Sequence, residues 1–149
     1  MQLSTRGRYA VMAMAELATR EASAADGCCR PVCLSEIAAR QRLSLPYLEQ
    51  LFARLRRAGL VRSARGPGGG YSLARPADCL AIAEILAAVR EGGPCGEMEG
   101  AADGDCACGT YALWIELGRQ IQLFLQGITL ADLLAGRVAG RAVKPAAAV

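Results

Sequence analysis

The sequence predicts a mainly α-helical protein that carries one small β-hairpin. Two observations predict this class. Apolar residues recur at spacings of three and four along several segments of the 149-residue chain, which is the period of an amphipathic helix. Between two of these segments lies LVRSARGPGGGYSLAR, in which two runs with strand propensity flank a tip of glycine and proline. Hydrophobic residues make up 53% of the chain, which is ample for the core of about one domain.

The first two helices are predicted at residues 8–20 and from residue 34 to near Arg42. The second begins at LSEI, where we expect Ser35 to cap the first turn. The expected apolar positions of the first helix are Tyr9, Val11, Met12, Met14 and Leu17. Those of the second are Ile37, Ala38 and Leu43.

A third helix is predicted after Ser44, which we expect to be its N-cap. Pro46 fits the first turn, because the N–H groups there have no partner within the helix. Gly59 is expected to end the helix. The buried stripe is formed by Tyr47, Leu48, Leu51, Phe52 and Leu55. The residues expected to point largely outward are Glu49, Gln50, Arg54, Arg56 and Arg57.

A hairpin with a glycine-rich tip follows the third helix. Two short helices and a hairpin in this order predict a winged helix-turn-helix domain, in which the second helix of the pair enters the major groove of DNA. The tip GPGGG lacks the lysine that a nucleotide-binding P-loop requires, so we do not interpret it as one. Arg65 at the tip suggests another role, because arginine recognises the narrow minor groove of A·T-rich DNA.

Two further helices are predicted at residues 80–90 and 111–126. The longer one has apolar residues on more than one face, and a small domain covers only one side of it. We therefore expect a two-fold homodimer through this helix, which would bind a palindromic site on double-stranded DNA. Its apolar residues are Leu113, Leu117, Ile121 and Phe124 on one line, with Trp114, Leu125 and Ile128 beside it. The predicted divisions are a winged helix-turn-helix domain at 1–78, a segment with the dimerisation helix at 79–134 and a disordered tail at 135–149.

The charge is divided unevenly along the chain. Residues 1–75 hold twelve arginines and five acidic residues, a balance of +7, whereas residues 76–149 hold five basic and nine acidic residues, a balance of −4. A basic N-terminal half favours a polyanion such as nucleic acid as partner, although solvated arginines on helix faces would give the same balance. No segment is predicted to cross a membrane or to direct export, so we expect a cytoplasmic protein.

Seven cysteines and the absence of histidine limit the chemistry of the chain. An odd number of cysteines in a reducing compartment favours metal binding, redox sensing or inert thiols over a full set of disulfides. Cys106 and Cys108 would face the same way in an extended segment, next to a helix start that favours their thiolate form. With Cys95, three thiolates can converge. The sequence pairs no nucleophile with a base in a recognisable motif, so we do not expect an enzyme.

Several motifs resemble one family. The stretches RGRYAVMAM, LSEIAARQRLSLPYLEQLFARLRRAGLVRSARGPGGGY and FLQGITLADL, together with ALW, resemble the IscR-like iron–sulfur cluster-binding winged-helix transcriptional regulators. The resemblance covers residues 1–134. It implies a homodimeric transcription factor that responds to the state of its own cluster. One departure is that Pro46 stands where the family commonly has a second serine beside Ser44, which removes one hydroxyl contact with DNA.

The resemblance also implies which side chains contact DNA. Glu49 and Gln50 would face base edges in the major groove, where glutamate can accept from cytosine N4 and glutamine can pair with adenine. Tyr47 and Arg54 would position the helix on phosphates, and Arg65 would enter the minor groove. The implied DNA-binding set is Ser44, Tyr47, Glu49, Gln50, Arg54 and Arg65.

The resemblance implies a small iron–sulfur cluster, of the 2Fe–2S type, in the cysteine loop. Cys95 and Cys108 match the outer two of three family cysteines, while Cys106 departs from the even spacing of the family. Tyr111 stands where IscR has a histidine. The fourth ligand therefore stays open between Tyr111, a carboxylate, a group of the partner subunit and an exogenous molecule. The candidate carboxylates are Glu97, Glu99, Asp103 and Asp105.

Two alternatives remain from the residues themselves. Zinc also accepts three sulfurs, so the loop could hold zinc or carry free thiols instead of a cluster. The chain would then be a winged-helix regulator or a protein-interaction module without a cluster. A second cysteine group, Cys28, Cys29 and Cys33, lies outside the family pattern. We favour its interpretation as inert thiols over a second metal site or a redox site.

Overall fold

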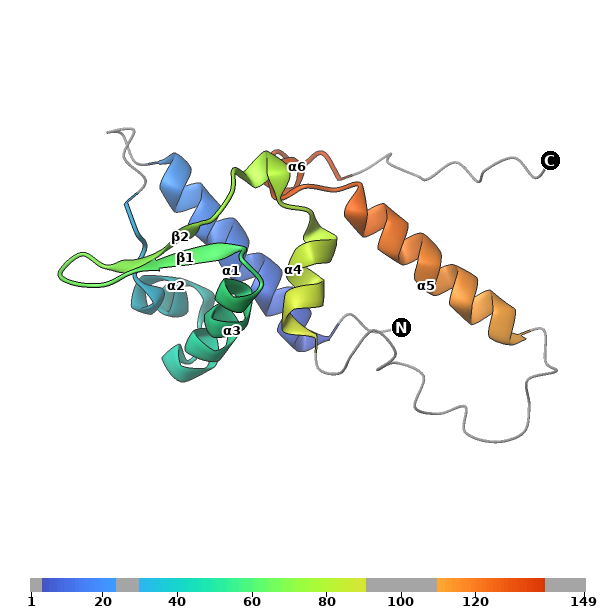
Figure 1. The fold of residues 1–149 in the computed structure, drawn as a ribbon, viewed down its shortest axis with the longest axis horizontal. Helices are drawn as coiled ribbons and strands as arrows, with labels where there is room; N and C mark the ends of the chain where they lie inside the picture. The colour runs from blue at the N-terminus through green and yellow to red at the C-terminus, as the bar shows by residue number, and fades with distance from the viewer. Residues whose placement is uncertain (1–3, 24–29, 91–109, 139–149) are drawn as a thin grey trace.

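The structure, a computed structural model, describes residues 4–23, 30–90 and 110–138. It is mainly α-helical with one two-stranded antiparallel sheet, which confirms the predicted class (Figure 1). The elements in chain order are α1 (Thr5–Ala22), α2 (Leu34–Gln41), α3 (Leu45–Arg57), β1 (Val61–Ala64), β2 (Gly70–Leu73), the 3-10 helix η1 (Ala77–Cys79), α4 (Ile82–Val89), α5 (Thr110–Gln126) and α6 (Leu130–Leu134). The helix pair α2–α3 and the hairpin β1–β2 pack around α1 as a winged helix-turn-helix.

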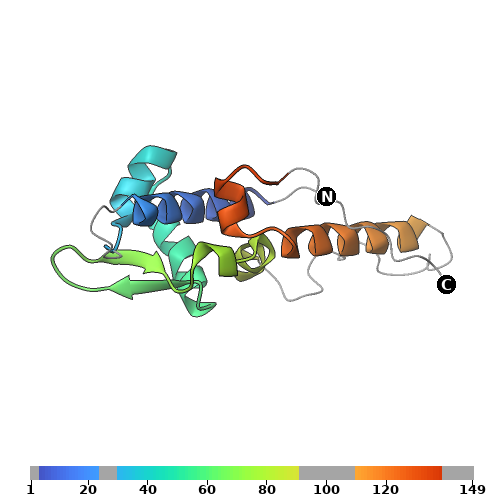
Figure 2. The ribbon, with the colours of Figure 1, turned by 90° about the horizontal axis from the view of Figure 1, so that it is seen from above.

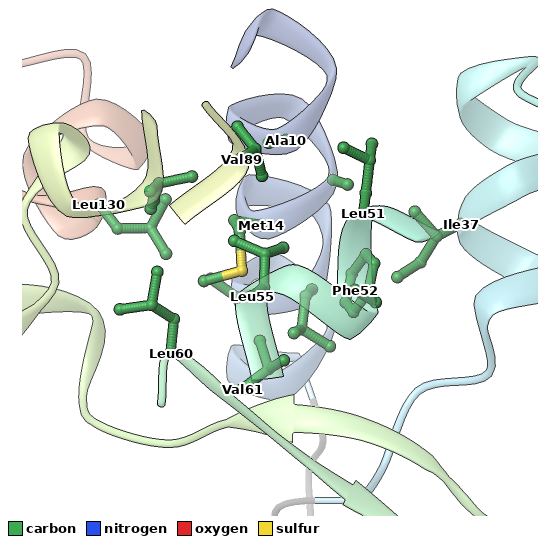
Figure 3. Close-up of a cluster of buried hydrophobic side chains, with 14 of the residues drawn as sticks. Ala10, Met14, Ile37, Leu51, Phe52, Leu55, Leu60, Val61, Val89 and Leu130 are labelled. Atoms are coloured by element: carbon green, nitrogen blue, oxygen red, sulfur yellow. The ribbon is translucent and has the colours of Figure 1, made fainter. Parts of the chain in front are cut away.

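The hydrophobic core is centred on α1, and α3, α4 and α6 cover it (Figure 3). Ala13 and Met14 of α1 are fully buried, whereas Met12 is 40% exposed. The predicted helix is confirmed, but its apolar position Met12 lies outside the packed face, which consists mostly of small residues. Small residues let helices approach closely, and a Cβ at Gly7 would lie only 2.8 Å from Leu86 Cδ2 of α4.

The helix α2 begins at Leu34, as the sequence predicted, but its capping residue differs. Its N-cap is Cys33, so the expected cap at Ser35 is wrong and Ser35 lies inside the first turn. The cause is a bridge to β2: the Val32 N–H donates to the Tyr71 carbonyl at 2.8 Å, and the Tyr71 N–H donates to the Val32 carbonyl at 2.9 Å. The chain turns into the helix directly after this bridge. At the other end the helix stops at Gln41, near the predicted boundary, and its C-cap Arg42 adopts a left-handed conformation with φ of 53°.

Two hydrogen bonds end α3 and turn the chain into β1. The Gly59 N–H donates to the Arg56 carbonyl, and the Leu60 N–H donates to the Leu55 carbonyl, each at 3.0 Å. This pair is the Schellman arrangement, which needs a left-handed residue after the helix. Gly59 has φ of +73°, a conformation that glycine adopts at little cost. The expected end of the helix at Gly59 is confirmed.

The wing, which we define as β1, β2 and the loop between them, is tied to the helices along the outer edge of β2. Besides the bridge to Val32, the Leu73 N–H donates to Glu21 Oε1 at the end of α1 at 2.6 Å. The ring of Tyr71 packs against Phe52 of α3 with centroids 4.9 Å apart. The sheet pairs Val61 with Leu73, Arg62 with Ser72, Ser63 with Tyr71 and Ala64 with Gly70.

Glu21 makes the stability of the wing junction depend on pH. Burial raises the pKa of this half-buried carboxyl, and the bond from the Leu73 N–H lowers it only in part. A raised pKa in the folded protein means that the stabilising contribution is complete below the unfolded pKa of about 4.3 and is lost as pH rises through the folded value. We therefore expect Glu21→Gln, which keeps an acceptor oxygen without charge, to be more stable than wild type at neutral pH.

Urea unfolding at neutral pH and at pH below about 4 measures this effect, and the advantage of Glu21→Gln is expected to vanish at the acidic pH. Glu21→Ala is the comparison variant. It leaves the Leu73 N–H without its acceptor and is expected to lose about 1–3 kcal/mol. A Glu21→Gln protein that is less stable than wild type at neutral pH would contradict the assignment.

A short antiparallel bridge joins the segment before α4 to the segment before α6. The Ile82 N–H donates to the Ile128 carbonyl at 2.9 Å, and the Leu130 N–H donates to the Leu80 carbonyl at 2.8 Å. Ile128, which the sequence placed with the long helix, lies beyond its end and is 1% exposed in the core. The predicted boundary between residues 78 and 79 falls inside η1, and core residues lie on both sides of it.

The helix α5 extends away from the body of the molecule, as both views show (Figures 1 and 2). Its contacts with the rest of the fold are mainly with α4. After α6, the chain forms a turn in which the Arg137 N–H donates to the Asp132 carbonyl at 2.9 Å. The predicted tail at 135–149 begins in this turn, and its residues beyond 138 lie outside the described ranges. Among the described helices, none is both long and apolar enough to cross a membrane.

Candidate nucleic-acid interface

The solvent side of α3 carries the side chains that the sequence assigned to DNA. Ser44, Glu49 and Gln50 are exposed, and Tyr47 and Arg54 are half-buried. The opposite side of the helix is held in the core by Leu48, Leu51, Phe52 and Leu55. The predicted faces of α3 are confirmed except at Tyr47, predicted buried, and Arg54, predicted to point outward, which are both half-buried. Core packing fixes which side chains can meet a ligand.

Glu49 differs from the other acidic side chains around it. Glu16 and Glu36 pair with Arg20, and Glu21 accepts the bond from the wing, whereas the described contacts give Glu49 no partner. A carboxylate on a surface that meets phosphates is unfavourable unless a donor compensates for it. The N4 amino group of cytosine is such a donor in the major groove. The position of Glu49 is therefore suited to reading a base.

The first turn of α3 is suited to holding an anion. Ser44 is the N-cap as predicted, and its hydroxyl accepts no capping bond from the helix. Pro46 occupies the first turn without loss of a helical hydrogen bond. The first-turn N–H groups have no partner within the helix, and they lie at the positive end of the helix dipole. A phosphate can bind at such a terminus, and the Ser44 hydroxyl lies at the same place.

Tyr47 is held in position by α1. Its ring meets the ring of Tyr9 edge to face, with centroids 6.1 Å apart and an angle of 87° between the planes. Edge-to-face pairs of this kind restrict the orientation of both rings. The phenol of Tyr47 is consequently positioned before any ligand arrives.

The wing presents Arg65 at its tip. Arg65 is exposed, and the loop turns back through Gly66 and Gly68, whose φ values are +105° and +79°. At the base of the wing, Arg56 of α3 donates from Nη1 to the Ser63 hydroxyl of β1 at 3.2 Å. The wing is thus connected to the C-terminal end of α3 as well as to α1.

Ion pairs fix α2 against α1. Arg20 donates from Nε to Glu16 at 2.8 Å and also pairs with Glu36 of α2, while Arg40 of α2 lies 3.3 Å from the second oxygen of Glu16. The hydrogen bond to Glu16 raises the pKa of the Arg20 guanidinium above its ordinary value. This network joins α2 to α1 at the surface, and α3 packs against α2.

The cysteines assigned to a metal, Cys95, Cys106 and Cys108, lie outside the described residues. Tyr111 lies in the first turn of α5. Within the described ranges, no group of three or more cysteine, histidine or carboxylate side chains could hold a metal ion. The chemistry of the donor set can still be tested from the sequence. Three cysteines are the ligand type that iron–sulfur clusters take, and a chain without histidine must complete the set with another group.

The two described cysteines are exposed and lie in different surroundings. The hydroxyl of Ser35 lies 2.9 Å from Cys33 Sγ and lowers the pKa of that thiol. The carboxylate of Asp78 raises the pKa of the Cys79 thiol. Cys28 and Cys29, predicted to accompany Cys33, lie outside the described residues.

Comparison with known proteins identifies the family of this winged helix-turn-helix. The model of the Rrf2 family, described as iron-dependent transcriptional regulators, matches residues 3–136. The chain belongs to the Rrf2 family. The family members most similar to it are transcriptional regulators rather than enzymes, and this chain is a DNA-binding transcriptional regulator of the IscR-like type.

Individual Rrf2 relatives match over most of their length. The HTH-type transcriptional regulator IscR of Photobacterium profundum is 47% identical over 136 residues, which is 90% of this chain and 76% of the relative. The solved structure of T. potens IscR has a TM-score of 0.71 at 38% identity, and the match covers 97% of this chain and 93% of that one. CymR, the global cysteine regulator of B. subtilis, has a TM-score of 0.72 at 32% identity, covering 91% and 98% of the two chains.

Sequence reasoning missed residues that position this interface. Glu21 and Leu73 are 52 positions apart, and no local pattern signals their bond. Val32 and Gly70 were also missed. A Cβ on Gly70 would lie 2.3 Å from the Val32 carbonyl oxygen, so β2 can approach the start of α2 only with glycine there. Gly70 directly follows the other glycines of the hairpin tip, so the sequence did not distinguish its role from theirs.

Proposed function

We propose that this Rrf2-family regulator binds a palindromic operator as a homodimer and responds to the state of an iron–sulfur cluster held by its own cysteines. The observation that carries the DNA part is the solvent face of α3, where Glu49 lies without an ion pair beside exposed Gln50. The 47% identity to an IscR supports the cluster part.

In this proposal α3 lies in the major groove. Glu49 accepts a hydrogen bond from cytosine N4 and Gln50 pairs with an adenine, because these are the base edges that match their acceptors and donors. Tyr47 and Arg54 donate to phosphates. The Ser44 hydroxyl and the first-turn N–H groups of α3 bind a further phosphate.

The wing reads a second feature of the operator. Arg65 enters the minor groove where a run of A·T pairs makes it narrow and electronegative. The connections of the wing to Glu21, to Val32 and to Arg56 fix how far its tip lies from α3. The protein therefore determines how far apart the operator must place the C·G pair that Glu49 contacts and the A·T run that Arg65 enters.

The homodimer forms through α5. Several large apolar side chains of this helix are exposed in the single chain, which a soluble monomer rarely tolerates on one face. A two-fold contact through them would bury the same surface on both subunits and place two α3 helices for two half-sites. The exposed fractions on this face are 60% for Leu113, 61% for Trp114, 40% for Leu117 and 36% for Phe124.

Cys95, Cys106 and Cys108 would hold the cluster, with the 2Fe–2S type as the proposed form. The bound cluster supplies a group whose presence depends on oxidants and on cluster supply. Tyr111 is one candidate for the remaining ligand, because it lies in the first turn of α5, directly after the cysteine loop in sequence. The helix α5 also carries the proposed dimer contact. Binding or loss of the cluster next to the start of α5 would therefore change the distance between the two DNA-binding domains.

One crossed experiment tests both parts. Wild type, Glu49→Ala, Arg65→Ala and Cys108→Ala are purified without oxygen and analysed for iron, sulfide, zinc and visible absorption. Each is then titrated with an operator selected by wild type from random duplex DNA. We expect Glu49→Ala and Arg65→Ala to keep iron and sulfide but to bind the operator about ten- to a hundredfold more weakly, the value of a good base contact. Cys108→Ala is expected to lose iron and absorption.

Arg119→Ala is the control for charge. Arg119 is exposed on α5 and, among the described residues, its ion pair is with Glu116 at the surface, so its loss should leave operator affinity nearly unchanged. If the purified protein contains zinc and no iron or sulfide, the cysteines bind zinc and the cluster proposal is refuted. Binding that shows neither sequence preference nor salt dependence would refute the DNA part and favour a protein partner.

A further inference from the structure

Leu45 is the exception among the leucines of α3. It is 38% exposed, whereas Leu48, Leu51 and Leu55 are at most 1% exposed. Leu45 is the first residue of the helix, next to the N-cap Ser44. The described structure therefore presents a large apolar side chain at the helix end that leads into the DNA groove.

The position of Leu45 relates it to the base-reading residues. Leu45 and Glu49 are four residues apart, so they lie on the same side of α3, separated by about 6 Å along the axis. Successive base pairs are spaced by about 3.4 Å, so the two side chains would meet bases one or two steps apart. Leu45 thus extends the base-reading face of α3 by one helical turn.

The major groove offers one apolar group that matches such a side chain, the C5-methyl group of thymine. We propose that Leu45 packs on a thymine methyl and makes the regulator select T at that position. The proposal rests on the proposed DNA-binding function and deepens it, because it names a base that the operator must contain. Leucine has no donor or acceptor, so it discriminates thymine from other pyrimidines by the methyl group alone.

The neighbour of Leu45 supports a preformed contact. Pro46 is also exposed and fixes its own φ in the first turn of the helix. The backbone directly after Leu45 is therefore restricted before DNA binds. A contact formed by a group that is already restricted loses little conformational entropy on binding.

Replacing thymine by deoxyuridine in the operator removes only the methyl group, which makes it a sharp test. The selected operator is made with deoxyuridine at each thymine in turn, always at the symmetry-related pair, and is titrated with wild type and with Leu45→Ala. For wild type, one pair of substitutions is expected to weaken binding about fourfold for each lost methyl contact, so about sixteenfold for the two half-sites. For Leu45→Ala the same substitution is expected to have no effect.

Glu49→Ala serves as the matched variant. It is expected to lose its preference at a C·G pair while keeping the deoxyuridine penalty of wild type. The inference is overturned if Leu45→Ala shows the same deoxyuridine penalty as wild type, or if wild type shows none at any thymine. Either of these results leaves sequence-specific binding intact, whereas a wild-type protein that selects no sequence refutes the proposed function itself.

Discussion

Glutamate in place of Leu117 on α5 will leave the regulator folded but monomeric, and its affinity for a palindromic operator will fall by about a hundredfold or more. Leu117 is 40% exposed in the single chain, and Leu113 and Phe124 continue its line at spacings of four and seven residues. A two-fold contact buries each substituted position twice. An uncompensated charge costs about 3–5 kcal/mol when buried, and about 1.4 kcal/mol corresponds to a factor of ten.

Sedimentation velocity measures the dissociation, and far-UV circular dichroism shows that the subunits keep their helices. Gln122→Glu is the control, because it adds the same carboxylate at an exposed position on a different side of α5. It should stay dimeric and bind the operator like wild type. A Leu117→Glu protein that sediments as a dimer would mean that α5 is covered by something other than a second copy.

Alanine in place of Gly70 will detach the wing from the helices and lower the free energy of unfolding by about 2–5 kcal/mol. The new Cβ would lie 2.3 Å from the carbonyl oxygen and 2.5 Å from the carbonyl carbon of Val32. Backbone atoms cannot swing aside as a flexible side chain can, so the bridge between Val32 and Tyr71 must open. Both of its hydrogen bonds would be lost, and Arg65 would no longer be held at a fixed distance from α3.

Urea unfolding measures the loss of stability, and amide hydrogen exchange at Tyr71 measures the opening of its bridge to Val32. Gly127→Ala is the matched control, because its Cβ would find the nearest carbonyl oxygen at 3.5 Å, an ordinary contact, and its φ is not in the left-handed region. It is expected to change stability little. If Gly70→Ala kept wild-type stability and operator affinity, the bridge would have no part in positioning the wing.

The helices of the proposed DNA interface follow from local patterns. The spacing of Leu48, Leu51 and Leu55 assigned the buried side of α3, and all three are buried. Gly59 marked the end of α3, because only a left-handed residue closes that kind of helix end easily. Periodicity and turn chemistry act within a few residues, which is why the sequence alone could predict them.

Contacts between distant segments could not be predicted in the same way. Ser35 was predicted as the cap because serine favours that position, but α2 starts directly after the bridge between Val32 and Tyr71, and its N-cap is Cys33. Met12 is one of the large apolar residues whose spacing predicted the first helix, but spacing did not tell which of them are buried. The close approach of α4 to α1 selected the alanine side, so Met12 is exposed.

The sequence by itself determined the order of the helices and the wing, the outward face of α3 with Glu49 and Gln50, and the surplus of apolar residues on α5. The tertiary structure decided that Glu21 and Val32 hold the wing, and that Leu45 stays exposed where its neighbours in α3 are buried. The reason is physical. Helix periods and turn preferences are set by neighbouring residues, whereas burial and hydrogen bonding between segments depend on which surfaces the whole chain brings together.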